Sequence, residues 1–186
     1  MAKLERPNLP NSLTILRVLL LPVCAYALFK NGGDDNTWRV IAWTLFFIVG
    51  LSDILDGKIA RDRNQITEFG KLLDPIADKA MLATATIGTS ILGMLSWWVT
   101  AVLLIRELAV TILRFAVINK GVIPASKGAK RKTFFQSFGV GFYILPLPTW
   151  LHLPRDIFMA YAIYLTITTG VDYFRQVLKK FCRLVK

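Results

Sequence analysis

Six apolar stretches restrict the fold of this chain more than any other feature of its sequence. They cover residues 12–29, 37–57, 72–92, 97–118, 133–151 and 155–175. A helix that crosses a bilayer needs roughly 20 apolar residues, with about 17 to 25 acceptable. Apolar residues make up 54% of the 186-residue chain, above the ~45–50% of soluble domains. The sequence therefore predicts an all-α polytopic membrane protein, with residues 1–186 forming a single domain.

Lysine and arginine are unevenly distributed among the segments that connect these stretches. Sixteen of them lie before residue 12, in the loops 58–71 and 119–133, or from residue 175 onward, whereas three lie in the alternate connections. Cytoplasmic loops of membrane proteins carry an excess of Lys and Arg. We therefore expect six transmembrane helices with both termini in the cytoplasm. This arrangement also accounts for the net charge of +11 without a nucleic-acid partner.

The first apolar stretch also has features of a cleaved signal peptide, namely a basic lead and a small-residue ending at Ala25 and Ala27. Arg17 lies inside the apolar run, however, and removing the run would leave an odd number of crossings. We expect the stretch to remain as a span. Cys24 and Cys182 match no metal or redox spacing, and no disulfide between them is expected because the basic tail should face a reducing cytosol.

Four aspartates mark the point where the second apolar stretch ends and the third begins: Asp53, Asp56, Asp74 and Asp78. Spacings of three and four residues place each pair on one helix face. Neighbouring carboxylates repel by about 1 kcal/mol in water and about 4 kcal/mol at an effective dielectric of 20, and a divalent cation offsets that repulsion. Oxygen ligands favour Mg²⁺ or Mn²⁺ over Zn²⁺, and magnesium commonly keeps substrate phosphates among its ligands. The pattern predicts a metal site for a phosphate-bearing substrate.

Other interpretations of these aspartates remain open. Asp74 directly precedes Pro75 and fits the N-cap of a helix, and the others could pair with nearby lysines and arginines. A divalent-cation transporter would also use intramembrane carboxylates. Transport, however, predicts polar residues toward the far side, whereas the outer halves of the spans are almost wholly apolar. This distribution favours catalysis on a lipid.

The aspartates belong to a longer pattern, D-x-x-D-G-x-x-A-R-x8-G-x-x-x-D-x-x-x-D, which resembles the motif of the CDP-alcohol phosphatidyltransferases. Its fixed positions are all present: Asp53, Asp56, Gly57, Ala60, Arg61, Gly70, Asp74 and Asp78. The resemblance implies a six-helix membrane enzyme that forms a homodimer. It also implies a reaction, in which the hydroxyl of an acceptor alcohol attacks the β-phosphorus of CDP-diacylglycerol and CMP is released.

The resemblance assigns roles to individual residues. It implies that two Mg²⁺ or Mn²⁺ ions are held by Asp53, Asp56, Asp74 and Asp78. Asp78 would also be the catalytic residue that acts as general base. The CDP-diacylglycerol pocket would be formed by Asn11, Thr14, Asp53, Gly57, Ala60, Arg61, Thr67 and Gly70.

Three further stretches, "RPNLPNSLTILRVLLLP", "IRELAVTILR" and "VIPASKGAKRKTFFQ", resemble the bacterial members of the family that use sn-glycerol 3-phosphate as acceptor. This acceptor carries its own phosphate, in addition to the diphosphate of the donor, and that phosphate needs cationic ligands. The candidates are Arg106, Arg114, Lys127, Lys130 and Lys132. They could instead set the membrane topology or attract anionic lipid.

The acceptor could be sn-glycerol 3-phosphate, inositol phosphate or phosphatidylglycerol. The motif residues do not distinguish these acceptors, because they bind CDP-diacylglycerol, the donor that these enzymes share. The expected partners are CDP-diacylglycerol, sn-glycerol 3-phosphate and the lipid bilayer. The expected location is the inner membrane of a bacterium, with the active site facing the cytoplasm.

Overall fold

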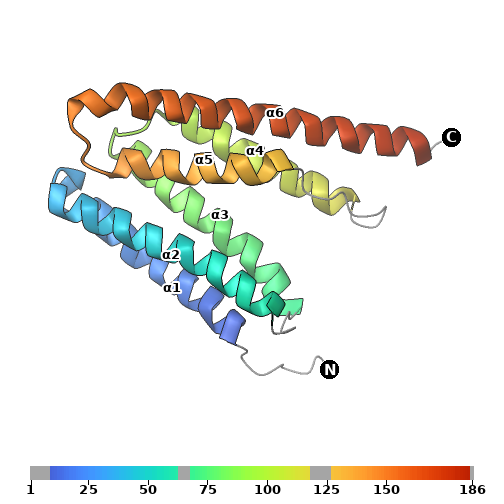
Figure 1. Cartoon of the computed structure of the whole chain (residues 1–186), viewed down its shortest axis with the longest axis horizontal. Helices are drawn as coiled ribbons and strands as arrows, with labels where there is room; N and C mark the ends of the chain where they lie inside the picture. The colour runs from blue at the N-terminus through green and yellow to red at the C-terminus, as the bar shows by residue number, and fades with distance from the viewer. Residues whose placement is uncertain (1–8, 63–67, 118–126, 185–186) are drawn as a thin grey trace. The chain divides into compact units, whose positions relative to one another are not determined.

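The computed structural model describes residues 9–62, 68–117 and 127–184, and side chains within 14–52, 75–114, 128 and 131–178. In these ranges the chain is helical and contains no strand, so the predicted all-α fold is confirmed for the described part (Figure 1). The chain divides into two compact units. The first comprises Met1–Met94 with Ile144–Pro146, and the second comprises Leu95–Tyr143 with Leu147–Lys186.

Each α-helix of the described chain overlaps one of the six predicted apolar stretches. The helices are α1 (Leu9–Phe29), α2 (Asn36–Asp62), α3 (Glu68–Ile91), α4 (Trp97–Val117), α5 (Lys127–Ile144) and α6 (His152–Leu184), with short 3-10 turns η1 (Lys30–Gly33) and η3 (Thr149–Leu151). Two described segments, Thr14–Gly33 and Thr149–Leu178, are long and apolar enough to cross a membrane by length and composition.

The fifth helix ends earlier than predicted, because α5 ends at Ile144 rather than at residue 151. Pro146 and Pro148 follow this end, and proline can neither donate a backbone hydrogen bond nor let the preceding residue stay easily in helical conformation. The guanidinium of Arg39 donates to the carbonyl oxygens of Ile144 and Leu145 at 2.9 and 3.0 Å. An arginine from the start of α2 therefore satisfies carbonyls at the end of α5.

In the first unit, α1 packs against both α2 and α3. Cys24 and Leu28 of α1 are fully buried, as are Ala42 of α2 and Ala77 of α3. Cys24 is a free thiol. Gly88 of α3 lets α1 approach closely, since a Cβ there would lie 2.7 Å from Leu28 Cδ2. Small residues on α3 thus allow its backbone to pack against the end of α1.

The turn between α1 and α2 depends on left-handed backbone conformations. Asn31, Gly32 and Gly33 have φ values of 54°, 70° and 81°. Asp35 then caps α2, because its Oδ1 accepts hydrogen bonds from the backbone N–H groups of Thr37 and Trp38. The side-chain amide of Asn31 and these backbone donors lower the pKa of the Asp35 carboxyl. Because this pKa is lowered in the fold, the cap's contribution to stability is lost as the pH falls through it.

In the second unit, α4 packs against α6, and α5 contacts α6 through aromatic rings. The ring of Phe135 lies 4.8 Å from Phe158 and 4.7 Å from Tyr161, centroid to centroid. One turn further along α5, a Cβ at Gly139 would lie 3.3 Å from Met159 Cε. These contacts pack α6 against α4 and α5, the two helices that carry the candidate acceptor cations.

Substituting Gly33 should destabilise the protein more than substituting Gly93, although both have positive φ. A Cβ at Gly33 would lie 2.7 Å from Leu92 Cδ1, whereas Gly93 faces open space. Both Gly→Ala changes incur backbone strain, and only the first also overpacks. We expect Gly33→Ala to lower the free energy of unfolding by about 1–3 kcal/mol more than Gly93→Ala, measured by thermal unfolding in detergent. Equal effects would contradict the proposed role of the Leu92 contact.

Candidate active site

Three helix ends of the first unit lie at one end of that unit: the start of α1, the end of α2 and the start of α3 (Figure 1). Asp53 and Asp56 belong to α2, and Asp74 and Asp78 belong to α3. Both segments are helical, so the predicted spacings of three and four residues apply within each helix. The fold therefore brings the motif-bearing ends of two helices to the same end of the first unit.

The interpretation of Asp74 as an N-cap is wrong. The helix α3 begins at Glu68, and Pro75 lies inside it. A proline within a helix has no N–H to donate to the carbonyl four residues earlier, and its ring disturbs that turn. The Asp74–Pro75 pair therefore lies inside α3, at the end of a turn that lacks one backbone hydrogen bond.

Asp78 forms an ion pair that joins α3 to α1. Arg17 Nη1 lies 3.4 Å from Asp78 Oδ1, and the two side chains are 1% and 53% exposed. A buried guanidinium in an apolar helix is costly unless it is paired. One turn before Arg17 on the same helix, Thr14 is also buried. Arg17 is not among the site residues predicted from the sequence, although a charge inside an apolar run is itself a signal of a partner.

Several predicted site residues lie outside the described part of the structure. Thr67 lies between the described ranges, and the helices are described without side chains at Asn11, Asp53, Asp56, Gly57, Ala60, Arg61, Gly70, Asp74, Lys127 and Lys130. Among the residues whose side chains are described, no group of three metal-ligating side chains occurs. The predicted metal set therefore remains a prediction.

The second unit contains a polar cluster that joins α4, α5 and α6. Arg106 Nη1 donates to Glu107 Oε1 at 3.1 Å, and its Nη2 donates to Thr169 Oγ1 at 3.0 Å. Lys132 of α5 donates to the same Glu107 oxygen. The side chains of Lys132, Arg106 and Glu107 are 5%, 15% and 19% exposed. Two predicted acceptor cations are thus brought together, with Glu107 between them.

The polar cluster carries one more positive charge than Glu107 can balance, because Arg106 and Lys132 share that one carboxylate. In addition, Arg106 Nε is buried and has no hydrogen-bond partner among the described residues. Arg114, two turns further along α4, has an exposed side chain. A buried excess of cationic donors is suited to binding an anion with several oxygens, such as a phosphate.

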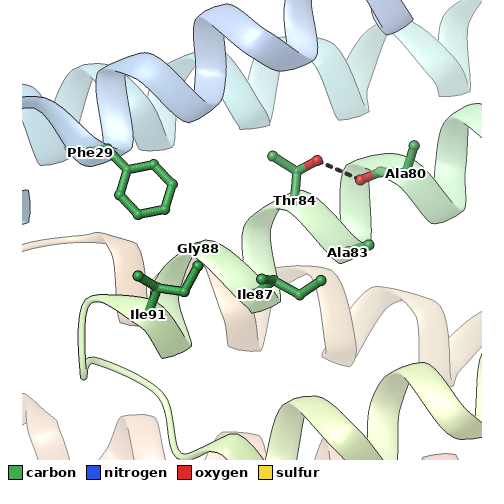
Figure 2. A pocket seen from close by; sticks show the side chains of 7 residues that line it. All are labelled: Phe29, Ala80, Ala83, Thr84, Ile87, Gly88 and Ile91. Carbon is green, nitrogen blue, oxygen red and sulfur yellow. Dashed lines mark hydrogen bonds between the residues drawn. The ribbon is translucent and has the colours of Figure 1, made fainter.

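A separate apolar groove of about 360 Å³ lies in the first unit, along α3 beyond Asp78. Figure 2 shows the Phe29 ring of α1 beside the α3 side chains that line the groove, with Thr84 Oγ1 donating to the Ala80 carbonyl at 2.8 Å. The groove is lined by Phe29, Ala80, Ala83, Thr84, Ile87, Gly88 and Ile91. No lining residue is ionisable, so the groove contains no candidate for acid–base chemistry.

Comparisons with known proteins identify the family of this chain. The model of the CDP-alcohol phosphatidyltransferase family matches residues 7–168. A probable phosphatidylglycerophosphate synthase of Mycobacterium tuberculosis is 50% identical over 92% of this chain and 82% of its own length. The CDP-diacylglycerol–glycerol-3-phosphate 3-phosphatidyltransferase of Bacillus subtilis is 34% identical over 91% of this chain and 94% of its own length. The chain therefore belongs to the CDP-alcohol phosphatidyltransferase family, and it is an enzyme of that class.

Solved structures support the fold. The crystal structure of M. tuberculosis phosphatidylinositol phosphate synthase with CDP-DAG bound matches with a TM-score of 0.63 and 20% identity, over 90% of this chain and 85% of that one. The same protein in complex with manganese and citrate matches with a TM-score of 0.62 and 20% identity, over 91% of this chain and 82% of that one. At this level of identity the likeness concerns the fold alone.

Replacing Arg17 should lower activity more than stability. In Arg17→Met the buried charge is removed, and Asp78, which is half exposed, keeps its hydration, so the fold should persist. Asp78 would lose a charged partner that orients its carboxylate. We expect phosphatidyl transfer to fall roughly tenfold or more, with a melting temperature close to that of the wild type. The matched control is Arg175→Met, which removes an exposed cation from α6, and equal activity in the two variants would contradict the prediction.

Proposed function

We propose that this protein transfers the phosphatidyl group from CDP-diacylglycerol to sn-glycerol 3-phosphate, giving phosphatidylglycerophosphate and CMP. The observation that carries the proposal is the complete family motif on α2 and α3, in a chain that is 50% identical to a probable phosphatidylglycerophosphate synthase. The excess positive charge of the polar cluster supports an acceptor that brings its own phosphate.

The donor half of the reaction belongs to the first unit. Asp53, Asp56, Asp74 and Asp78 would hold two divalent ions, Mg²⁺ or Mn²⁺, because paired carboxylates on helix faces provide the oxygen ligands that these ions prefer. When bound, the metal neutralises the diphosphate and the departing CMP. The nucleotide would lie against Asn11, Thr14, Gly57, Ala60, Arg61, Thr67 and Gly70, where small residues permit close approach to the backbone.

Asp78 would act as the general base. Its carboxylate takes the proton of the acceptor hydroxyl as that oxygen bonds to the β-phosphorus, and the bond from this phosphorus to the oxygen of CMP breaks. Arg17, 3.4 Å from Asp78 Oδ1, orients the carboxylate and balances its charge before the proton arrives. Arg17 therefore acts as a positioning residue.

The acceptor half belongs to the second unit, where Arg106 and Lys132 would bind the phosphate of sn-glycerol 3-phosphate. Glu107 holds both cations in place through one carboxylate oxygen. Arg114, Lys127 and Lys130 would add attraction for the incoming anion. An uncharged acceptor would gain little binding energy from such a cluster of cations.

We further propose six transmembrane helices in the inner membrane of a bacterium, both termini and the active site facing the cytoplasm, and a homodimer. Large apolar side chains on α4 support exposure to lipid, since Ile105, Leu108 and Ile112 are 65%, 58% and 66% exposed. The helix α6 has 33 residues, or about 50 Å at 1.5 Å per residue. It exceeds the ~30 Å hydrocarbon core, so its basic C-terminal turns would lie beyond the membrane.

The decisive experiment measures CMP release by the purified protein with CDP-diacylglycerol and Mg²⁺. We expect release that depends on sn-glycerol 3-phosphate and that falls by at least a hundredfold in Asp78→Asn, because the amide cannot take the proton. Asp172→Asn, which changes an exposed aspartate on α6, should retain activity. Release only with inositol phosphate or phosphatidylglycerol would overturn the acceptor assignment. Absence of CMP release with every acceptor, in folded protein, would overturn the assignment of enzymatic activity.

The polar cluster predicts a selective defect in acceptor binding. Lys132→Met removes a buried ammonium group that is proposed to bind the acceptor phosphate, so the KM for sn-glycerol 3-phosphate should rise roughly tenfold to hundredfold. The KM for CDP-diacylglycerol should stay within about twofold, because the donor is proposed to bind the first unit. Arg131→Met is the matched control, since Arg131 is an exposed cation on the same helix. Equal KM changes for both substrates would count against the assignment of Lys132.

A further inference from the structure

Gln136 of α5 is a buried polar side chain that the reaction described above does not use. It is 2% exposed, and both its Oε1 and its Nε2 lack a hydrogen-bond partner among the described residues. Buried amide groups in proteins are almost always hydrogen-bonded, because an unmade bond in an apolar interior is costly. A buried amide without these hydrogen bonds is suited to bind a polar group of a ligand.

The position of Gln136 connects it to the polar cluster. It follows Lys132 by four residues on α5, so the two side chains lie on one face, about 5–6 Å apart at Cβ. Lys132 contacts Glu107, which also accepts from Arg106. An acceptor phosphate bound by these cations would place the remainder of the acceptor within reach of this face of α5.

The chemistry of the amide selects the group that it would bind. A carboxamide offers one acceptor and two donors, and a hydroxyl both donates and accepts, so the two are complementary. A phosphate accepts only, and would leave the amide oxygen without a donor. The reacting hydroxyl of sn-glycerol 3-phosphate is already assigned to Asp78, which leaves the hydroxyl on the central carbon.

We propose that Gln136 binds the non-reacting, central hydroxyl of the acceptor and thereby determines specificity for a glycerol backbone. The proposal rests on the proposed function, since it assigns part of the same acceptor. Within the second unit, the acceptor would then make two kinds of contact: its phosphate with Arg106 and Lys132, and its central hydroxyl with Gln136.

The test compares sn-glycerol 3-phosphate with 3-hydroxypropyl phosphate, which keeps the phosphate and a terminal hydroxyl but lacks the central one. CMP release by the full chain would give kcat/KM for each acceptor in the wild type and in Gln136→Met, which has a similar length and no hydrogen-bonding amide. Gln176→Met, the same change at an exposed position of α6, is the matched control. Gln136→Leu provides a second apolar variant in case the first does not fold.

We expect the wild type and Gln176→Met to prefer sn-glycerol 3-phosphate by roughly tenfold to hundredfold. In Gln136→Met the preference should fall to within about threefold, through a loss with sn-glycerol 3-phosphate alone. Equal losses with both acceptors, an unchanged preference, or no preference in the wild type would each overturn the role of Gln136 while leaving the proposed function intact. Absence of CMP release from the wild type with both acceptors would overturn both.

Discussion

The cost of placing charge in apolar surroundings governs the arrangement of this protein. Arg17 and Lys132 are buried, and the side chain of Arg106 is only 15% exposed. An isolated charge in such surroundings would be strongly destabilising. Each is paired with a carboxylate: Arg17 with Asp78, and the other two with Glu107. These pairs join α1 to α3 and α4 to α5, so the side chains proposed for the reaction are also the ones that satisfy the need for charge pairing.

The two paired clusters have different electrostatic characters, which match the proposed halves of the reaction. The first unit gathers four aspartates of the motif onto α2 and α3, an acidic set suited to cations. The second unit joins two cations to a single carboxylate, a set suited to an anion. A transfer between a diphosphate lipid and a phosphorylated alcohol needs both characters.

Helix positions were largely predictable because apolar runs and turn residues are local features. Each predicted stretch overlaps a helix. The two differences involve prolines: Pro146 and Pro148 follow the early end of α5 at Ile144. The Asp74–Pro75 pair suggested a helix start, whereas α3 already begins at Glu68. The pairing of acidic positions on helix faces was also predictable, since it follows from spacing alone. Pairing between helices was not, because Arg17 and Asp78 are 61 residues apart and no periodicity connects them.

The sequence by itself determined the family, the helical class and the identity of the motif aspartates, because these depend on residue types at fixed spacings. Tertiary structure decided which charges meet. It brought Arg17 to Asp78, made Glu107 the shared partner of Arg106 and Lys132, and left Gln136 buried with neither amide atom hydrogen-bonded among the described residues. The physical reason is that burial and pairing are properties of packed helices, whereas the sequence records only the order in which their residues follow one another.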